Sequence, residues 1–398
     1  MTYRTGPLLL SLLTLACSSP TAEKPTGVPP SLEAIQAFGD SLAQRALAYP
    51  HDALSGRWSV ETLLHNMQAY GLPSQAAQAK TAERWQYDLS ELLAEYWDLE
   101  SPNQKHYAGV HRYYYDSLGA GHLVLHTYNQ HGDHFFDFTV AQIEGRLQVT
   151  EVFLYDWGMP LSQLMVRRQA IENGQYYGFS EINLPLKELT HTLPKYYAAL
   201  HALHYPDQYD SYQTLLGLPQ AYRQDPAWQV AHFEANYEEP EIQLTHLEEW
   251  EEHFPDNLAA LYYRNRFQTN YGRVSYEKLD ATLDTLENLV GPGPGLVHDR
   301  IENLFGRVPD AEREEHIREA ISRFPHYHPL YYRLVYLLVG QKDWPALQEA
   351  LTQAYDLAGL TITDIQWYGS TEFLTSPYGQ AVAEHQGLTI QQVLQQIR

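Results

Sequence analysis

Histidines are the residues in this sequence whose type and spacing come nearest to a metal site. Of the 19 histidines, four surround one predicted β-hairpin: His122, His126, His131 and His134. A zinc ion takes three or four ligands that converge on one point. His122 and His126 would share a strand face, but no spacing in the sequence brings all four together. We interpret the group as the polar part of a solvent-facing hairpin, with metal binding as the alternative.

Motifs for cofactors and catalysis are missing from the sequence. His201 and His204 are one helical turn apart, a spacing that can bind a metal ion, but no third ligand accompanies them. No HExxH or G-x-S-x-G pattern occurs. The segment GPGPG at 291–295 lacks the Lys-Ser/Thr of a phosphate loop, and its prolines remove N–H donors. It is typical of a loop between helices. We therefore predict no metal, no cofactor and no enzymatic activity.

The tripeptide Tyr-Tyr-Arg occurs twice, in the segments FPDNLAALYYR and FPHYHPLYYR, which begin at Phe254 and Phe324. It supplies the candidate binding residues: Tyr262, Tyr263, Arg264, Tyr331, Tyr332 and Arg333. Two interpretations are open. Either one tyrosine packs between helices while the arginine covers it or pairs with an acid, or the residues form a recognition ladder on a concave surface. The second interpretation rests on the enrichment of tyrosine and arginine among residues that dominate binding energy.

Composition limits the classes of partner. The chain has 398 residues, with 26 Lys plus Arg against 49 Asp plus Glu, so its formal net charge is −23. Phosphate backbones and anionic lipid surfaces repel such a charge, so we predict no nucleic-acid binding. Aromatic residues make up 13% of the chain and include 31 tyrosines, which serve both packing and recognition.

The only cysteine, Cys17, ends an apolar N-terminal run. The run is too short to cross a bilayer, which needs about 20 apolar residues, but it fits the apolar region of a secretory signal. The segment resembles the signal of bacterial lipoproteins, although Thr14 stands where that signal usually has leucine. The resemblance implies a signal peptide over residues 1–16, a lipid on Cys17, and a place in the cell envelope, on the outer membrane or the periplasmic side. A plain secreted protein and a cytosolic chain are the alternatives.

The segments that follow Cys17 predict a tether and then an α+β domain. Residues 17–30 contain four prolines and no apolar periodicity, which is typical of an extended tether. Residues 31–158 begin with three amphipathic helices, the first capped by Ser31. Four strand-like runs then alternate with short turns: 105–115, 121–129, 133–143 and 146–155. Such short connections indicate a four-stranded antiparallel sheet. The order of elements is similar to that of cystatin-like or nuclear-transport-factor-like domains.

Residues 159–358 read as helices with a period of about 35 residues. Phe-Pro precedes Leu-Tyr-Tyr-Arg twice, seventy residues apart, and a Val-Gly-Pro sequence lies halfway between them. The period resembles the tetratricopeptide repeat, a helix–turn–helix unit of 34 residues. We expect an inter-helix turn at Gly340. The resemblance implies an all-α solenoid with a concave binding surface, and residues 359–398 are expected to cap it.

Two classes of function follow from this reading. The first is a membrane-tethered interaction protein of the cell envelope that binds a peptide or protein partner on its helical repeats. The acidic surface would favour a basic partner. The second is a surface lipoprotein that binds glycans or nutrients, because exposed tyrosines suit the stacking of sugars. In both cases the lipid anchor is the only contact with the membrane.

Overall fold

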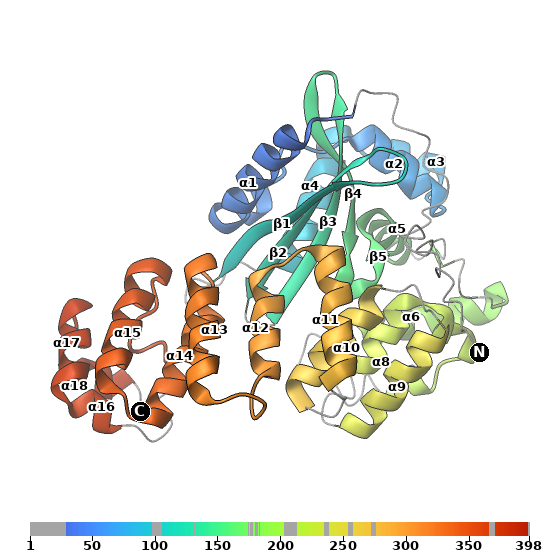
Figure 1. Ribbon diagram of the computed structural model, residues 1–398. Coiled ribbons are helices and arrows are strands. Elements are labelled where there is room, and N and C mark those ends of the chain that lie inside the picture. The colour runs from blue at the N-terminus through green and yellow to red at the C-terminus, as the bar shows by residue number, and fades with distance from the viewer. Residues whose placement is uncertain are drawn as a thin grey trace, which may run out of the picture. The chain divides into compact units, whose positions relative to one another are not determined.

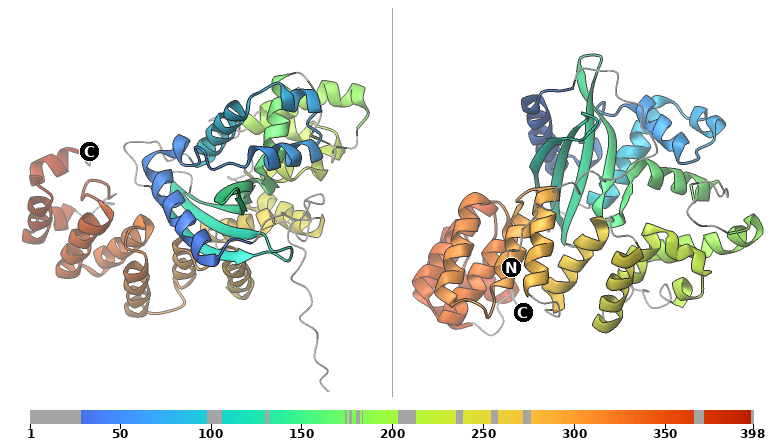
Figure 2. Two further views of the ribbon diagram at one scale, coloured as in Figure 1. Left: turned by 90° about the horizontal axis from the view of Figure 1, so that it is seen from above. Right: turned by 45° about the vertical axis from the view of Figure 1, so that its right-hand side comes forward.

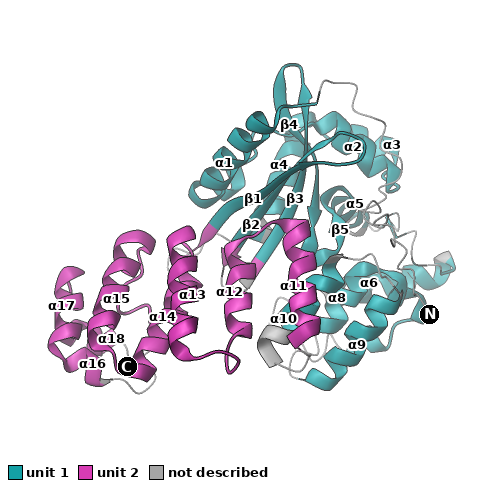
Figure 3. Cartoon of the chain, viewed as in Figure 1, with its two compact units in different colours: residues 1–100, 108–127, 134–271 teal, residues 101–107, 128–133, 272–398 magenta. Residues whose placement is uncertain are grey.

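The computed structural model of the chain describes residues 29–97, 106–129, 132–173, 175, 178–179, 182, 184–202, 213–234, 239–253, 258–271, 276–365 and 371–396. They form helices and one sheet, which pack into the two compact units coloured in Figure 3. Unit 1 comprises residues 1–100, 108–127 and 134–271. Unit 2 comprises residues 101–107, 128–133 and 272–398. The domain limits drawn from the sequence stay predictions.

The sheet is an antiparallel meander of five strands in the order β1-β2-β3-β4-β5 (Figure 1). Its strands are β1 (Tyr107–Tyr115), β2 (Gly121–Asn129), β3 (Gly132–Ile143), β4 (Arg146–Leu154) and β5 (Met159–Pro160). The predicted count of four is wrong because β5 adds a fifth strand. β5 pairs with the end of β4 after a 3₁₀ turn that Gly158 closes at a φ of 59°. Two residues are too few to show the alternation that reveals a strand.

Helices of unit 1 pack on one face of the sheet and form an apolar core with it. They are α1 (Leu32–Ala48), α2 (Val60–Ala69), α3 (Ser74–Gln78), α4 (Ala82–Trp97) and α5 (Leu161–Glu172). The Ser31 cap is confirmed, because its hydroxyl accepts a hydrogen bond from the Ala34 amide at 3.2 Å. The third of the predicted amphipathic helices is α4. Its buried side chains include Trp85 and Leu89, one turn apart on a single face.

A second core of unit 1 joins α5 to α6 (Leu186–Ala202) and α8 (Pro226–Glu234). Two further helices follow, with α9 (Pro240–His253) packed on α8 and α10 (Leu258–Tyr271) packed on α9. Arg167 of α5 donates two hydrogen bonds to the Asp225 carboxylate, at 2.8 and 2.9 Å. The Asp225 carboxylate also accepts a hydrogen bond from the Ala227 amide at 3.0 Å. This ion pair is almost wholly buried, so it fixes the start of α8 against α5.

Unit 2 consists mainly of consecutive helices; from α11 to α15 each packs on the next along the chain, and α17 packs on α15, α16 and α18 (Figures 1 and 2). They are α11 (Tyr276–Val290), α12 (Pro294–Asn303), α13 (Asp310–Arg323), α14 (His328–Gln341), α15 (Trp344–Ala358), α16 (Thr371–Thr375), α17 (Pro377–His385) and α18 (Ile390–Gln396). The turn expected at Gly340 begins two residues later, since α14 includes Gly340, ends at Gln341 and is capped by Lys342 with a φ of 58°. Asp343 then caps α15 by accepting the Ala346 amide at 3.1 Å.

No helix in the described part of the chain is long and apolar enough to cross a membrane.

Candidate functional site

The first Tyr-Tyr-Arg copy lies in α10 and is buried in unit 1. Tyr262 packs edge-to-face on Phe135, with ring centroids 6.2 Å apart. Tyr263 donates a hydrogen bond to the Asp156 carbonyl at 3.2 Å. Arg264 is only 2% exposed and pairs with the Glu251 carboxylate through two nitrogens. In this copy, the packing interpretation accounts for all three side chains.

The second copy lies in α14, and its three residues have different surroundings. Tyr331 is fully buried, and its hydroxyl donates to the Pro325 carbonyl at 3.0 Å. Tyr332 and Arg333 are half-buried. Arg333 is the more open of the two arginines, with 41% of its side chain exposed. Of the six predicted residues, Tyr332 and Arg333 are therefore the two that solvent reaches most easily.

Tyrosines and carboxylates gather beside Arg333 in unit 2. Tyr327, just before α14, donates a hydrogen bond to the Asp133 carboxylate at 2.8 Å. Tyr107 and Tyr128 pack edge-to-face on the Tyr327 ring, each with a centroid distance of 5.5 Å. Edge-to-face contacts of this kind are favourable for aromatic rings. Tyr327 is fully buried, whereas the two flanking rings are half-buried, so Tyr327 forms the floor of the group.

The α12 helix contributes a histidine and two further acids to this group. Arg333 Nε lies 2.7 Å from the Glu302 carboxylate and 3.4 Å from His298 Nε2. The other ring nitrogen of His298 lies 3.6 Å from the Asp299 carboxylate. We call the whole set the tyrosine–carboxylate cluster: Tyr107, Tyr128, Asp133, His298, Asp299, Glu302, Tyr327, Tyr332 and Arg333. Its carboxylates outnumber its one guanidinium.

The GPGPG segment explains how Asp133 is held. Its loop part ends at Gly293, and Pro294 and Gly295 form the first turn of α12. A side chain at Gly295 would place its Cβ 2.7 Å from the nearer Asp133 carboxylate oxygen. Glycine therefore leaves room for the carboxylate at the N-terminus of α12, where backbone N–H groups favour negative charge.

Burial and the nearby carboxylates keep the tyrosine hydroxyls of the cluster protonated. Burial, and then the Asp133 charge, raise the pKa of Tyr107, Tyr128 and Tyr327. Burial, Asp364 and the neighbouring Tyr128 and Tyr336 raise the pKa of Tyr332 to about 12. Such hydroxyls act as hydrogen-bond donors and not as proton-abstracting bases. The arrangement suits binding of a cationic group, which can contact tyrosine faces and carboxylates together.

The three described histidines of the predicted hairpin, His122, His126 and His134, do not converge on one point. His126 is fully buried and stacks on Phe135 at a centroid distance of 4.7 Å, so the solvent-facing interpretation is wrong for it. His122 pairs with Asp137 at 2.9 Å, and His134 pairs with Asp156. The described residues contain no group of three or more His, Cys, Asp or Glu side chains able to hold a metal ion. His131, His204 and the side chain of His201 lie outside the described residues.

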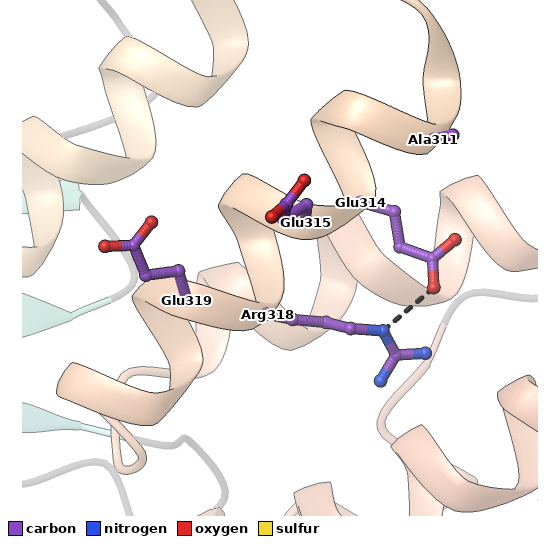
Figure 4. A pocket seen from close by; sticks show the side chains of 5 residues that line it. All are labelled: Ala311, Glu314, Glu315, Arg318 and Glu319. Atoms are coloured by element: carbon purple, nitrogen blue, oxygen red, sulfur yellow. Dashed lines mark hydrogen bonds and ion pairs between the residues drawn. The ribbon is translucent and has the colours of Figure 1, made fainter.

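A shallow hollow on α13 is a further surface feature in the described part of unit 2 (Figure 4). Its lining residues all come from that one helix: Ala311, Glu314, Glu315, Arg318 and Glu319. Arg318 Nε is already bonded to the Glu314 carboxylate at 2.8 Å. We interpret the hollow as the solvent-facing side of an acidic helix.

Sequence reasoning missed most of the tyrosine–carboxylate cluster. It identified Tyr332 and Arg333 but not Tyr107, Tyr128 or Tyr327, because strand tyrosines read as ordinary sheet residues. Gly295 was the available signal, since a glycine in the first turn of a helix indicates that another group approaches the backbone closely.

Comparisons with protein-family models, curated proteins and solved structures found no match to this chain. The function must therefore be argued from the geometry of the cluster.

Proposed function

We propose that this protein is a lipid-anchored binding protein of the bacterial cell envelope. Its tyrosine–carboxylate cluster would bind a lysine- or arginine-containing segment of a peptide or protein partner. One observation carries this proposal. Three carboxylates, those of Asp133, Asp299 and Glu302, lie in a group of tyrosine rings in which Arg333 is the one permanent cation.

The energies of such contacts are adequate for weak to moderate binding. A cation over a tyrosine face contributes about 0.5–2 kcal/mol. At an effective dielectric constant of about 20, a unit charge 4 Å from a carboxylate gains about 4 kcal/mol before desolvation is subtracted. The net charge of −23 adds long-range attraction, which speeds the approach of a basic partner.

The spacing of the helices supports a tetratricopeptide-like solenoid as the scaffold. Alternate helices begin at Pro240, Tyr276, Asp310 and Trp344, about 34–36 residues apart. From α11 to α15, each helix packs on its neighbour in sequence, as in arrays of helix pairs. Two half-exposed cluster members, Tyr332 and Arg333, lie on α14. A peptide segment could therefore lie along this helix, next to exposed Tyr336.

Peptide titrations test the binding site. Full-length protein would be titrated with a fluorescein-labelled peptide of about ten residues that contains three lysines, and with the same peptide acetylated on each lysine. We expect the unmodified peptide to bind at least tenfold more tightly. Asp299→Asn and Glu302→Gln should each weaken its binding about fivefold. The control is Glu319→Gln, which changes an exposed acid on α13 and should change the affinity less than twofold. Equal losses in all three variants would mean non-specific attraction and would refute the site.

The proposed anchor has a separate test. Cys17→Ala should move the protein from the membrane fraction of the cells to the soluble fraction. Mass spectrometry of the mature N-terminal peptide should show a lipid on Cys17 in the unchanged protein. Detection of residues 1–16 on the protein recovered from cells would contradict the proposed signal peptide.

Glycan binding is the second candidate, and the open tyrosine rings favour it. Tyr336 is 40% exposed. It lies near enough to the half-buried Tyr332 to raise the pKa of that side chain, so the two rings could form a stacking surface for a sugar. The protein would then bind neutral oligosaccharides on an array. Tyr336→Ala would abolish this binding, and Glu302→Gln would leave it unchanged. Binding of that kind, without binding of the basic peptide, would replace the first proposal by the second.

A further inference from the structure

Three apolar side chains are exposed where the described chain begins. Leu32 at the start of α1 is 44% exposed, Tyr115 at the end of β1 is 43% exposed, and Leu118 in the β1–β2 turn is 57% exposed. All three belong to unit 1. We call them the entry patch, because Leu32 and Tyr115 lie beside Pro30, the last residue of the predicted tether, and Leu118 lies in the turn that follows Tyr115.

Specific contacts hold Pro30 and the start of α1 against the β1–β2 hairpin. The Tyr115 hydroxyl donates a hydrogen bond to the Pro30 carbonyl at 2.5 Å. At the start of β2, a Cβ added to Gly121 would lie 3.2 Å from the Pro30 ring and 2.7 Å from the Ile35 side chain. The glycine thus lets the start of α1 pack closely on the hairpin. The tether exit and the turn are therefore parts of one packed surface.

The turn that carries Leu118 is ordered by its own hydrogen bonds. The Asp116 carboxylate accepts hydrogen bonds from the Leu118 amide at 2.9 Å and from the Ala120 amide at 2.8 Å. Gly119 has a φ of +84°, a conformation that glycine adopts without strain. Leu118 is thus held outward at the tip of a fixed turn, where a large apolar side chain gains nothing from water.

We propose that the entry patch contacts the surface of the lipid bilayer to which Cys17 is tethered, and so orients unit 1 on the membrane. This inference rests on the proposed lipid anchor and is independent of the proposed peptide site. Twelve residues separate Cys17 from Pro30, and the extended tether predicted for them would span at most about 40 Å. The bilayer is therefore at a high effective concentration, and a weak contact is sufficient.

The chemistry of the entry patch fits the interfacial region of a bilayer. Tyrosine is enriched at membrane–water interfaces, and leucine side chains partition into the apolar layer below. Residues 29–44 contain no lysine or arginine, and two acids, Glu33 and Asp116, lie close to the patch. The contact should therefore depend on apolar insertion and change little with salt concentration, unlike the adhesion of a basic surface to anionic lipid.

Photo-crosslinking in native membranes tests the entry patch. The full chain would be made in bacterial cells with p-benzoylphenylalanine in place of Leu118 and, as the matched control, in place of Tyr49. Tyr49 is 67% exposed and follows the other end of α1, about 25 Å along the helix. We expect at least fivefold more lipid adduct, detected by mass spectrometry, at position 118 than at position 49. Adding 1 M salt to the membranes should reduce the adduct less than twofold.

The same samples separate failure of the patch from failure of the anchor. If Cys17 carries a lipid and position 118 gives no more adduct than position 49, the patch proposal is wrong and the anchor stands. If Cys17 carries no lipid and no adduct forms, both are wrong. The peptide titrations address the tyrosine–carboxylate cluster in unit 2, so their result decides the binding function separately.

Discussion

For Gly295→Ala, this structure and general helix propensity predict changes in stability of opposite sign. Alanine in a helix is normally more stable than glycine by about 0.5–1 kcal/mol. At Gly295, however, the added Cβ would lie 2.7 Å from the nearer Asp133 carboxylate oxygen and 2.8 Å from its carbon. The carboxylate has to move, and with it the hydrogen bond from Tyr327 at 2.8 Å.

The loss of stability in Gly295→Ala follows from the contacts that break when the Asp133 carboxylate moves. A buried hydroxyl left without a partner costs about 1–3 kcal/mol, and Tyr327 is fully buried. Moving an anion from a helix N-terminus costs a further 0.3–1 kcal/mol or so. After subtraction of the propensity gain, we expect Gly295→Ala to lower the free energy of unfolding of unit 2 by about 1–3 kcal/mol.

Hydrogen exchange on the full chain measures this change, because a chain of two units need not unfold in one transition. Peptides from α12 and α14 should exchange faster in Gly295→Ala. The matched control is Gly340→Ala, since Gly340 is also helical and a Cβ there meets nothing within 4 Å. That variant should be as stable as the unchanged protein or slightly more so.

A double-mutant cycle assigns the cause of the effect. In an Asp133→Ala background, Gly295→Ala should no longer destabilise unit 2, because the group that it displaces is gone. The reasoning is refuted if Gly295→Ala alone matches Gly340→Ala, or if its cost persists unchanged without the Asp133 carboxylate.

Three further predictions concern other parts of the fold. Burial lowers the pKa of His232 to about 3 and of His246 to about 4, below the ordinary value of about 6.5. The unfolded chain therefore binds protons first. As the pH falls from 6.5 to 4, unit 1 should lose roughly 2–3 kcal/mol of stability for each histidine, measured by guanidinium unfolding at both pH values. His246→Gln should make the stability of unit 1 depend less on pH. Arg167→Met should cost unit 1 about 3–5 kcal/mol by leaving the Asp225 carboxylate buried without its partner, and a fall of the unfolding midpoint in guanidinium would show it. Asp343→Ala should cost about 1 kcal/mol through loss of the α15 cap, seen as faster hydrogen exchange in the first turn of that helix.

The sheet could be predicted from the sequence because its evidence is local. Runs of aromatic and β-branched residues, separated by turn residues, predicted β1 to β4 with nearly their observed first and last residues. The fifth strand could not be predicted. It exists because Gly158 turns the chain back after β4, and two residues carry no periodic signal.

The cluster could not be predicted because its members come from distant parts of the chain. Tyr107, Tyr128 and Asp133 lie at strand ends, and Tyr327 lies some 190 residues later along the chain. No spacing in the sequence links them. The repeat identified the helix that carries Tyr332 and Arg333, but a repeat establishes equivalent backbone positions and not equivalent neighbours. The tripeptide is consequently wholly buried in α10, whereas two of its three residues are half-buried in α14.

The two arginines of the repeated tripeptide give a comparison in which this difference can be measured. Arg264 is 2% exposed and bonded to Glu251 through two nitrogens. Arg264→Ala removes buried stem atoms and the charge-assisted hydrogen bonds to Glu251, whose side chain is 30% exposed, so it should cost unit 1 about 2–3 kcal/mol. The Arg333 side chain is 41% exposed, and a partly exposed pair of this kind contributes about 0–1 kcal/mol. Arg333→Ala should therefore change the stability of unit 2 by less than about 1 kcal/mol.

Binding by the Arg333→Ala variant distinguishes the two interpretations of the tripeptide. If Arg333 were part of a recognition ladder, its removal would weaken the binding of a partner. In a site for cations, Arg333 competes with the ligand for the Glu302 carboxylate, 2.7 Å away. Arg333→Ala should then tighten the binding of the lysine-containing peptide about two- to fivefold, and Glu302→Gln in the same chain should remove the gain. Weaker peptide binding by Arg333→Ala, at unchanged stability, would show that the arginine itself contacts the ligand and that the cation-site reasoning is wrong.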